Sequence, residues 1–265
     1  MGRHRLRAVA QHLWPAARTP AGAQRQRGAI AVEGGRTLDA EEVAGHAEAY
    51  VRDGYAHIPS VVPESVCARA AAALWSDMGA SPADANSWPA AGGYSGRIEA
   101  PAVLDAWSAG HLRLAEALAS AMEGSEALAG VGLPPPSCLV RPVSTMAIHR
   151  LPERREPGRE PGREPEWRWP TPHIDHNGDS WHSNPSPVRI SSMTYFTDAA
   201  THGQGGTVVW PGSAARLAAV ARRTAGSMAE VDRELKRVTA DLQPVEVRPR
   251  AGDVLFCAMP PPISP

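Results

Sequence analysis

An imidazole and a carboxylate two residues apart form the pattern in this chain that most directly suggests chemistry. The segment TPHIDHNGDSWH contains His173 and Asp175, and we expect residues 173–176 to form a strand. Because side chains alternate along a strand, both groups would point to one face. They would supply two corners of a 2-His-1-carboxylate iron site, which leaves positions open for oxygen and a cosubstrate. A polar surface strand would show the same spacing, so the spacing alone leaves both interpretations open.

Further histidines lie near this pair or in an apolar stripe. We interpret His176, His182 and His202 as loop or rim residues, and the movement of one of them to a vacant metal position stays an open alternative. His111 falls on the apolar face of a helix predicted for residues 101–123. A single histidine in such a stripe is more often a hydrogen-bonded core residue than a ligand, so we expect His111 in the core.

Helices are expected first along the chain. Asp39 and Glu42 match a capping box at the start of an amphipathic helix. Residues 55–62 have the composition of a strand, and Pro63 suits the first turn of a second helix. These elements would precede the β-rich part of the chain.

Strands are expected from Cys138 onward, where short runs rich in Val, Ile and Thr alternate with turn residues. Two helical patterns, residues 214–223 and 228–239, interrupt these runs and are expected to pack on the sheet surface. The candidate strands are residues 138–149, 173–176, 188–198, 207–210, 245–247 and 254–257.

Composition limits the classes of partner. The 265 residues carry a formal net charge of -1, which favours neither nucleic acid nor an anionic membrane. No apolar run is long enough to span a membrane, and three separated cysteines suggest neither a disulfide framework nor a zinc knuckle. We therefore expect a monomer that acts on a small molecule.

Two segments are expected to lie outside the core. Residues 1–36 are rich in arginine and suit a disordered tail or a transit peptide, so the expected location is the cytoplasm, or an organelle such as the mitochondrion. Residues 151–169 contain the repeat REPGREPGREP, whose prolines, glycines and charges indicate a solvated low-complexity loop. The remainder, residues 37–265, is expected to form one domain.

Four segments in this order resemble the phytanoyl-CoA dioxygenase family. They are LDAEEVAGHAEAYVRDGYAHIP, HID, GGTVVWPGS and GDVLFC. The resemblance implies an α+β fold with a double-stranded β-helix core (jelly-roll, cupin-like) on which the N-terminal helices pack. It also implies Fe(II) and 2-oxoglutarate as cofactor and cosubstrate, and hydroxylation of a small organic or lipid-like substrate.

The resemblance also assigns roles to single residues. His173 and Asp175 match two iron ligands, and Arg150 lies nearest the position that binds the 2-oxoglutarate carboxylates, although it could equally begin the charged loop. An arginine suits a carboxylate because it donates two parallel hydrogen bonds. Gly205, Gly206, Pro211 and Gly212 are interpreted as turn-forming residues that shape the site.

The C-terminal end departs from the family pattern. Relatives continue the GDV strand to a second iron-binding histidine and then an arginine, whereas this chain reads AMPPPISP after Cys257. We therefore expect an incomplete end and weakened metal binding. The alternative function is a non-catalytic ligand-binding protein on the same scaffold.

Overall fold

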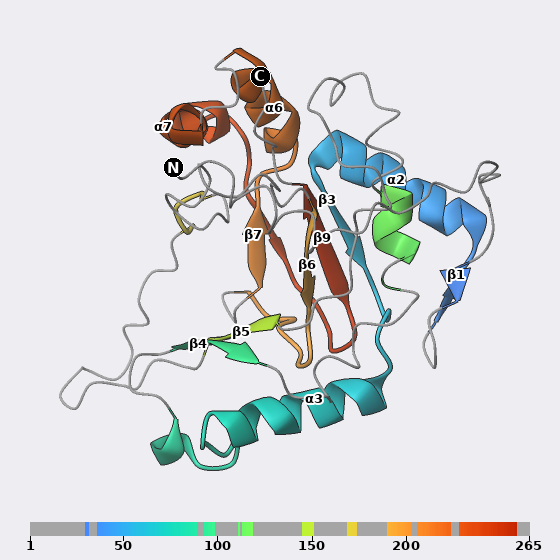
Figure 1. Ribbon diagram of the computed structural model, residues 1–265, viewed down its shortest axis with the longest axis vertical. Coiled ribbons are helices and arrows are strands. Elements are labelled where there is room, and N and C mark those ends of the chain that lie inside the picture. Colours follow the sequence, from blue (N-terminus) through green and yellow to red (C-terminus); the bar gives the residue numbers. More distant parts are fainter. Residues whose placement is uncertain are drawn as a thin grey trace, which may run out of the picture.

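The centre of the molecule is a three-stranded antiparallel sheet (Figure 1). Its strands are β3 (Tyr55–Ile58), β9 (Val254–Ala258) and β6 (Ile190–Thr194), in the order β3-β9-β6. Strands from the beginning and the end of the chain thus lie side by side. The computed structural model describes residues 30–31, 36–88, 93–98, 111, 113–118, 145–150, 169–173, 190–202, 206–223 and 228–258.

The first long helix, α2 (Ala40–Asp53), begins at the predicted capping box. The Asp39 side chain accepts hydrogen bonds from the backbone of Glu41 and Glu42 at 2.9 Å each. The Glu42 carboxylate accepts in return from the Asp39 backbone at 3.2 Å, so two N–H groups at the helix start are satisfied. Gly54, with φ 83°, then ends the helix and leads directly into β3.

The second helix, α3 (Glu64–Asp77), corrects the expectation for Pro63. Pro63 is the residue just before the helix rather than part of its first turn. Strand β3 also stops at Ile58 instead of continuing to Val62, because the chain turns at Ser60, whose φ is 56°. A turn in the left-handed region cannot continue a strand.

A second pair of strands carries a helical insertion. β7 (Thr207–Val209) and β8 (Val245–Val247) pair antiparallel, and α6 (Ser213–Arg223) and α7 (Met228–Thr239) lie between them in the sequence. The two helices pack on each other at one end of the strands (Figure 1) and bury their own small core. Its members are Leu217, Val220, Val231, Leu235 and Val238. The predicted helical insertion between the strands is therefore confirmed, but its two helices pack mainly on each other rather than on the sheet surface.

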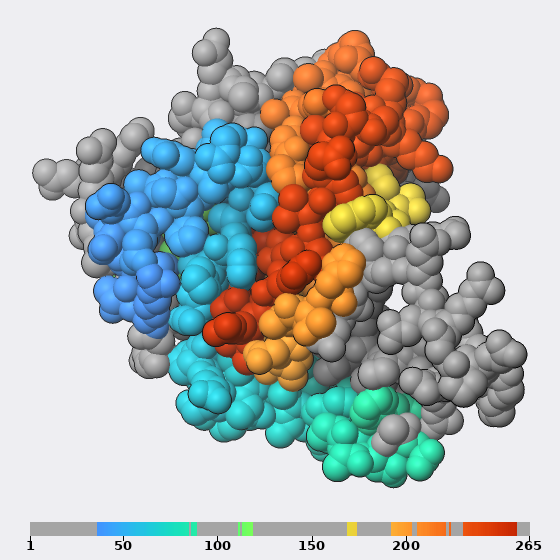
Figure 2. Space-filling view, turned by 180° about the vertical axis from the view of Figure 1, so that it is seen from behind, coloured from blue at the N-terminus to red at the C-terminus, as the bar shows by residue number. Residues whose placement is uncertain are grey.

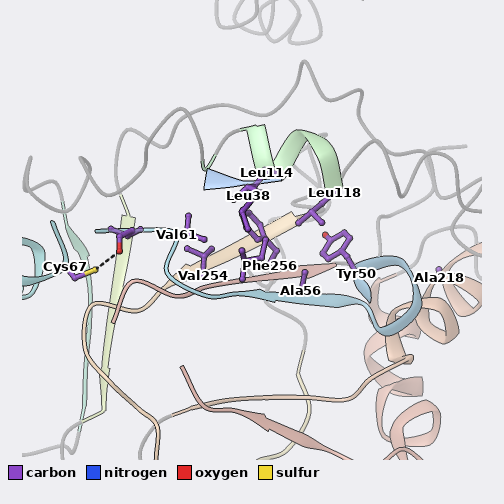
Figure 3. Packing of buried hydrophobic residues seen from close by; sticks show 13 residues of the cluster. Leu38, Tyr50, Ala56, Val61, Cys67, Leu114, Leu118, Ala218, Val254 and Phe256 are labelled. Atoms are coloured by element: carbon purple, nitrogen blue, oxygen red, sulfur yellow. Dashed lines mark hydrogen bonds between the residues drawn. The ribbon is translucent and has the colours of Figure 1, made fainter. Parts of the chain in front are cut away.

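The main core lies on one face of the central sheet (Figure 3). Val254 and Phe256 of β9 belong to it, together with Tyr50 of α2 and with Leu114. His111 is fully buried as well, and the centroids of the His111 and Phe256 rings lie 5.8 Å apart in an edge-on arrangement. The prediction of a core histidine is confirmed.

The opposite face of the sheet is also covered. Leu255, between Val254 and Phe256, points to this face and is fully buried, although it is not part of the main core cluster. By strand register, His57 and Met193 flank Leu255 on the same face. This face carries polar as well as apolar groups, which makes it relevant to function.

Three of the remaining strands were not expected: β1 (Ile30–Ala31), which pairs with β2 (Thr37–Leu38), and β4 (Gly93–Ile98). β4 pairs with β5 (Thr145–Arg150), which overlaps the strand expected over residues 138–149, and η1 (Ala85–Ser87) is a short 3₁₀ turn. The described ranges thus combine helices with small antiparallel sheets, and the double-stranded β-helix stays a prediction. Among the helices in these ranges, none has the length and apolar character needed to cross a membrane.

Candidate functional site: two histidines held by buried carboxylates

The residues proposed from the sequence are only partly described. Residues 169–173 contain no strand, so the prediction of a strand is wrong at His173, whose side chain is exposed. Two prolines among the four residues before His173 remove backbone donors, which explains why no ladder forms there. Arg150 is the last residue of β5, where its backbone pairs with Gly93. Asp175, His176 and His182 lie outside the described residues.

No three metal-binding side chains come together within the ranges that the structure describes. The structure instead shows two other histidines paired with carboxylates, His57 and His202, of which only His202 was considered from the sequence, as a loop residue that could move to a vacant metal position. Each is held by a nearly buried carboxylate, from Asp253 and Glu246 respectively. Asp253 belongs to the GDVLFC segment, and Glu246 lies against Gly206 of the GGTVVWPGS segment.

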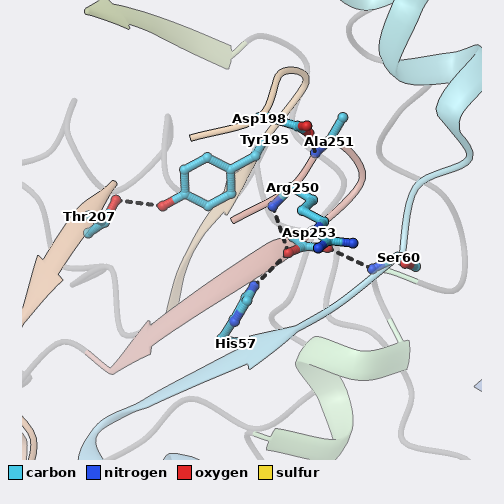
Figure 4. Close-up of polar contacts among 8 residues, drawn as sticks. All are labelled: His57, Ser60, Tyr195, Asp198, Thr207, Arg250, Ala251 and Asp253. Atoms are coloured by element: carbon cyan, nitrogen blue, oxygen red, sulfur yellow. Dashed lines mark hydrogen bonds and ion pairs between the residues drawn. The ribbon is translucent and has the colours of Figure 1, made fainter. Parts of the chain in front are cut away.

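The first pair joins β3 to the residue that precedes β9 (Figure 4). Asp253 has a side chain only 6% exposed, and its carboxylate accepts from the His57 Nε2 at 2.8 Å. It also accepts from the backbone N–H groups of Ser60 and Arg250, each at 2.9 Å. Three donors therefore compensate the burial of one negative charge.

Gly252 brings the two backbone segments of this pair together. Its carbonyl accepts from the Val62 N–H at 2.9 Å, and its φ is 93°. A Cβ atom at this position would lie 2.3 Å from the Val62 carbonyl oxygen. The Gly-Asp sequence thus works as a unit, because the glycine permits the close approach and the aspartate secures it.

The second pair lies beside the β7–β8 sheet. The His202 Nδ1 and the Glu246 Oε2 are 2.5 Å apart, and the Glu246 side chain is only 3% exposed, whereas that of His202 is 45% exposed. The Arg248 Nε lies 3.7 Å from the same carboxylate oxygen. Gly206 makes room for this carboxylate, since a Cβ there would lie 3.1 Å from the Glu246 Cγ and 2.3 Å from the Val247 carbonyl oxygen.

The segment that leads to His173 contacts the second pair. The centroids of the Trp169 and His202 rings lie 6.3 Å apart, with an angle of 73° between the ring planes. In Figure 2 residues 169–173, in yellow, border the orange and red C-terminal part of the chain. The segment that leads to the predicted metal ligands therefore contacts His202 through Trp169, although Trp169 and His202 are more than thirty residues apart in the sequence.

A tyrosine links the central sheet to β7. The Tyr195 hydroxyl and the Thr207 Oγ1 are 2.5 Å apart (Figure 4). The Thr207 Oγ1 also lies 3.6 Å from the Met193 sulfur. Burial raises the pKa of Tyr195 to about 12, although the hydrogen bond with Thr207 opposes this shift. Tyr195 thus keeps its proton at neutral pH and holds β7 beside β6.

The raised pKa predicts a loss of stability at alkaline pH. In the unfolded chain tyrosine ionises near pH 10, so the folded state holds this proton more tightly and its stabilising effect is complete below that pH. The effect is lost as the pH rises towards about 12. At about pH 11.5 we expect Tyr195 to account for about 2 kcal/mol of the decrease in the free energy of unfolding.

Urea unfolding at several pH values checks this expectation. Burial also raises the pKa of Tyr50 and that of Cys67, the latter to about 11, so part of the alkaline decrease belongs to these groups. The Tyr195→Phe variant should therefore show a shallower decrease than the unmodified chain. An identical decrease in both proteins would contradict the assignment.

Neither carboxylate–histidine pair was predicted from the sequence, although His202 was considered there as a residue that could move to a vacant metal position. His57 stood in a predicted strand and Asp253 in a quoted motif, but nothing in the sequence links residues so far apart. Glu246 and His202 had no distinguishing spacing at all. Comparison with known proteins adds no relative: no family model, no curated protein and no solved structure matches this chain. The resemblance therefore stays a hypothesis that rests on the four segments alone.

Proposed function

We propose that this chain is an Fe(II)- and 2-oxoglutarate-dependent dioxygenase that oxidises a small organic or lipid-like substrate. The observation that carries the proposal is the pairing of β3 with β9. These strands contain the YAHI and VLFC parts of the first and last resembling segments, which stand nearly two hundred residues apart in the sequence. Segments that define one family motif set are expected to be neighbours in its fold, so their pairing supports the proposal.

The third resembling segment supports the proposal in the same way. GGTVVWPGS contains β7, and its first described residue, Gly206, accommodates β8 through the close approach to Val247. Thr207 connects β7 to Tyr195 at the end of β6. Three of the four resembling segments are therefore directly connected around the central sheet.

The proposed metal ligands belong to the remaining segment, HID: His173 and Asp175 would hold the metal. Arg150, which lies outside the four segments, would bind a carboxylate of 2-oxoglutarate. The donor types fit Fe(II), which accepts imidazole nitrogen and carboxylate oxygen. Bound iron would couple the activation of oxygen to the oxidative decarboxylation of 2-oxoglutarate and the oxidation of an organic substrate.

Metal-dependent binding of 2-oxoglutarate is the first test. Under anaerobic conditions, 2-oxoglutarate at a hundredfold excess over its dissociation constant should stabilise the metal-loaded protein by about 2.7 kcal/mol, seen as a higher melting temperature. His173→Ala and Asp175→Ala should abolish this stabilisation, whereas His46→Ala on α2 should retain it. Arg150→Leu should weaken the binding of 2-oxoglutarate without affecting that of the metal.

Succinate formation separates the two functions considered from the sequence. Admission of oxygen to the loaded protein should produce succinate that depends on both iron and 2-oxoglutarate. If 2-oxoglutarate binds but no succinate forms with any of a panel of fatty acyl and small organic substrates, the chain is a ligand-binding protein on the same scaffold. Absence of metal-dependent 2-oxoglutarate binding would contradict the proposal.

A further inference from the structure

We propose that His202 is a positioning residue for the segment of residues 169–173. Held by Glu246, it fixes this segment beside the β7–β8 sheet through Trp169, and so limits the positions open to His173. The inference rests on the proposed function for the role of His173 as a metal ligand, and on the structure for the contacts that hold the segment. In this role His202 touches Trp169 rather than the metal.

The Glu246 carboxylate is the fixed end of this arrangement. Its strand, β8, pairs with β7, where Glu246 stands opposite Val208. The Glu246 side chain is only 3% exposed, and its Oε2 lies 2.5 Å from the His202 Nδ1. Gly206 lies close beside it, since a Cβ there would be 3.1 Å from the Glu246 Cγ and 3.3 Å from its Oε1. A buried carboxylate in so narrow a space retains its donor, because an unsatisfied charge is costly there.

The His202 ring connects this carboxylate to Trp169. The two ring centroids are 6.3 Å apart with 73° between the planes, which is the edge-to-face arrangement that aromatic pairs favour. Trp169 is 47% exposed, so its surroundings cover about half of the residue. A half-exposed indole gains less from burial than a core residue does, and its orientation therefore depends more on a directional contact such as this one.

Two prolines transmit the position of Trp169 along the segment. Pro170 and Pro172 fix their own φ angles and restrict Trp169 and Thr171, which precede them, to extended conformations. A segment with so few conformations follows a change in the position of its first residue. The place of Trp169 thus sets the starting point and the direction of the segment that ends at His173, and no direct contact between the two ends of the arrangement is needed.

Fluorine NMR of the full chain labelled with 5-fluorotryptophan tests the contact without any metal. Trp169→Phe assigns the Trp169 signal by its absence. We expect His202→Ala to narrow this signal and to shift it towards that of the free amino acid, because the indole gains freedom. His202→Asn retains an N–H donor for Glu246 but has no ring, so it should give the same change while it preserves the melting temperature. His46→Ala on α2 should leave the Trp169 signal unchanged.

Calorimetric titration with Co(II) tests whether the contact positions a metal ligand. Trp169→Ala and His202→Ala should each weaken Co(II) binding by about 10-fold, as loss of an orienting partner does. The double variant should also lose about 10-fold, because two changes that remove one contact are not additive. Trp169→Phe keeps an aromatic ring against His202 and should restore the affinity to within about threefold of that of the unmodified chain.

The outcomes distinguish this inference from the proposed function. A Trp169 signal that stays unchanged in both His202 variants would overturn the inference, and so would a loss of about 100-fold in the double variant, which indicates two independent effects. Unchanged Co(II) affinity in Trp169→Ala would also overturn it and leave the dioxygenase proposal intact. If the Trp169 signal responds but the unmodified chain binds neither Co(II) nor Fe(II), the contact is supported, whereas the dioxygenase proposal and the positioning of a metal ligand are both contradicted.

Discussion

Replacement of Gly252 by alanine is expected to lower the free energy of unfolding by about 4 kcal/mol, a value at the upper end for single substitutions. Two costs add at this position. A φ of 93° is unfavourable for any residue with a Cβ atom. The new methyl group would also lie 2.3 Å from the Val62 carbonyl oxygen, which belongs to the backbone and cannot rotate away.

Gly212 provides a matched control for the conformational part of this cost. Its φ is 81°, and a Cβ atom there would meet nothing within 4 Å. Gly212→Ala should therefore cost only about 1 to 2 kcal/mol, the penalty of a left-handed conformation. Urea unfolding of the two variants measures the difference. Equal costs would show that the approach of Gly252 to Val62 is not close in the folded protein.

Removal of the Asp253 side chain is expected to cost a similar amount, about 3 to 5 kcal/mol. Asp253→Ala would leave the backbone donors of Ser60 and Arg250 without their acceptor in a nearly buried site, and His57 would lose its partner as well. Ser60 is already in a strained conformation with φ 56°, so the turn that follows β3 should loosen first. Hydrogen exchange of the Ser60 amide would report this directly.

Graded variants show which contact of Asp253 matters most. Asp253→Asn keeps one oxygen acceptor and should cost about half as much as the alanine variant. His57→Gln keeps a side-chain donor for the carboxylate and should stay within about 1 kcal/mol of the unmodified chain. If Asp253→Ala cost less than about 1 kcal/mol, the three hydrogen bonds could not be the main link between the two turns.

Helix positions were accessible from the sequence because local interactions decide them. The capping box of Asp39 and Glu42 predicts the start of α2, and the structure contains both of its hydrogen bonds. The patterns for residues 214–223 and 228–239 correspond closely to α6 and α7. Each of these signals involves residues three or four positions apart, which is the range of contacts within a helix.

Some strands were predicted from the sequence and others were missed. β8 and most of β9 follow from runs of Val, Leu and Phe, whereas β4 was missed because GYSGRI contains two glycines and no apolar alternation. The strand expected at His173 is wrong there, because alternating prolines outweigh the motif. Pairing with β5 stabilises β4, and such pairing depends on a partner far away in the sequence.

The sequence of this protein thus determined its helices, its turn glycines and the residue types that could bind a metal, since all of these depend on neighbouring residues. Only the tertiary structure decided that Asp253 reaches His57, that Glu246 holds His202, and that Trp169 lies against His202. The physical reason is that a buried carboxylate needs donors from whichever segments the fold places around it, and chain topology, not local spacing, selects those segments.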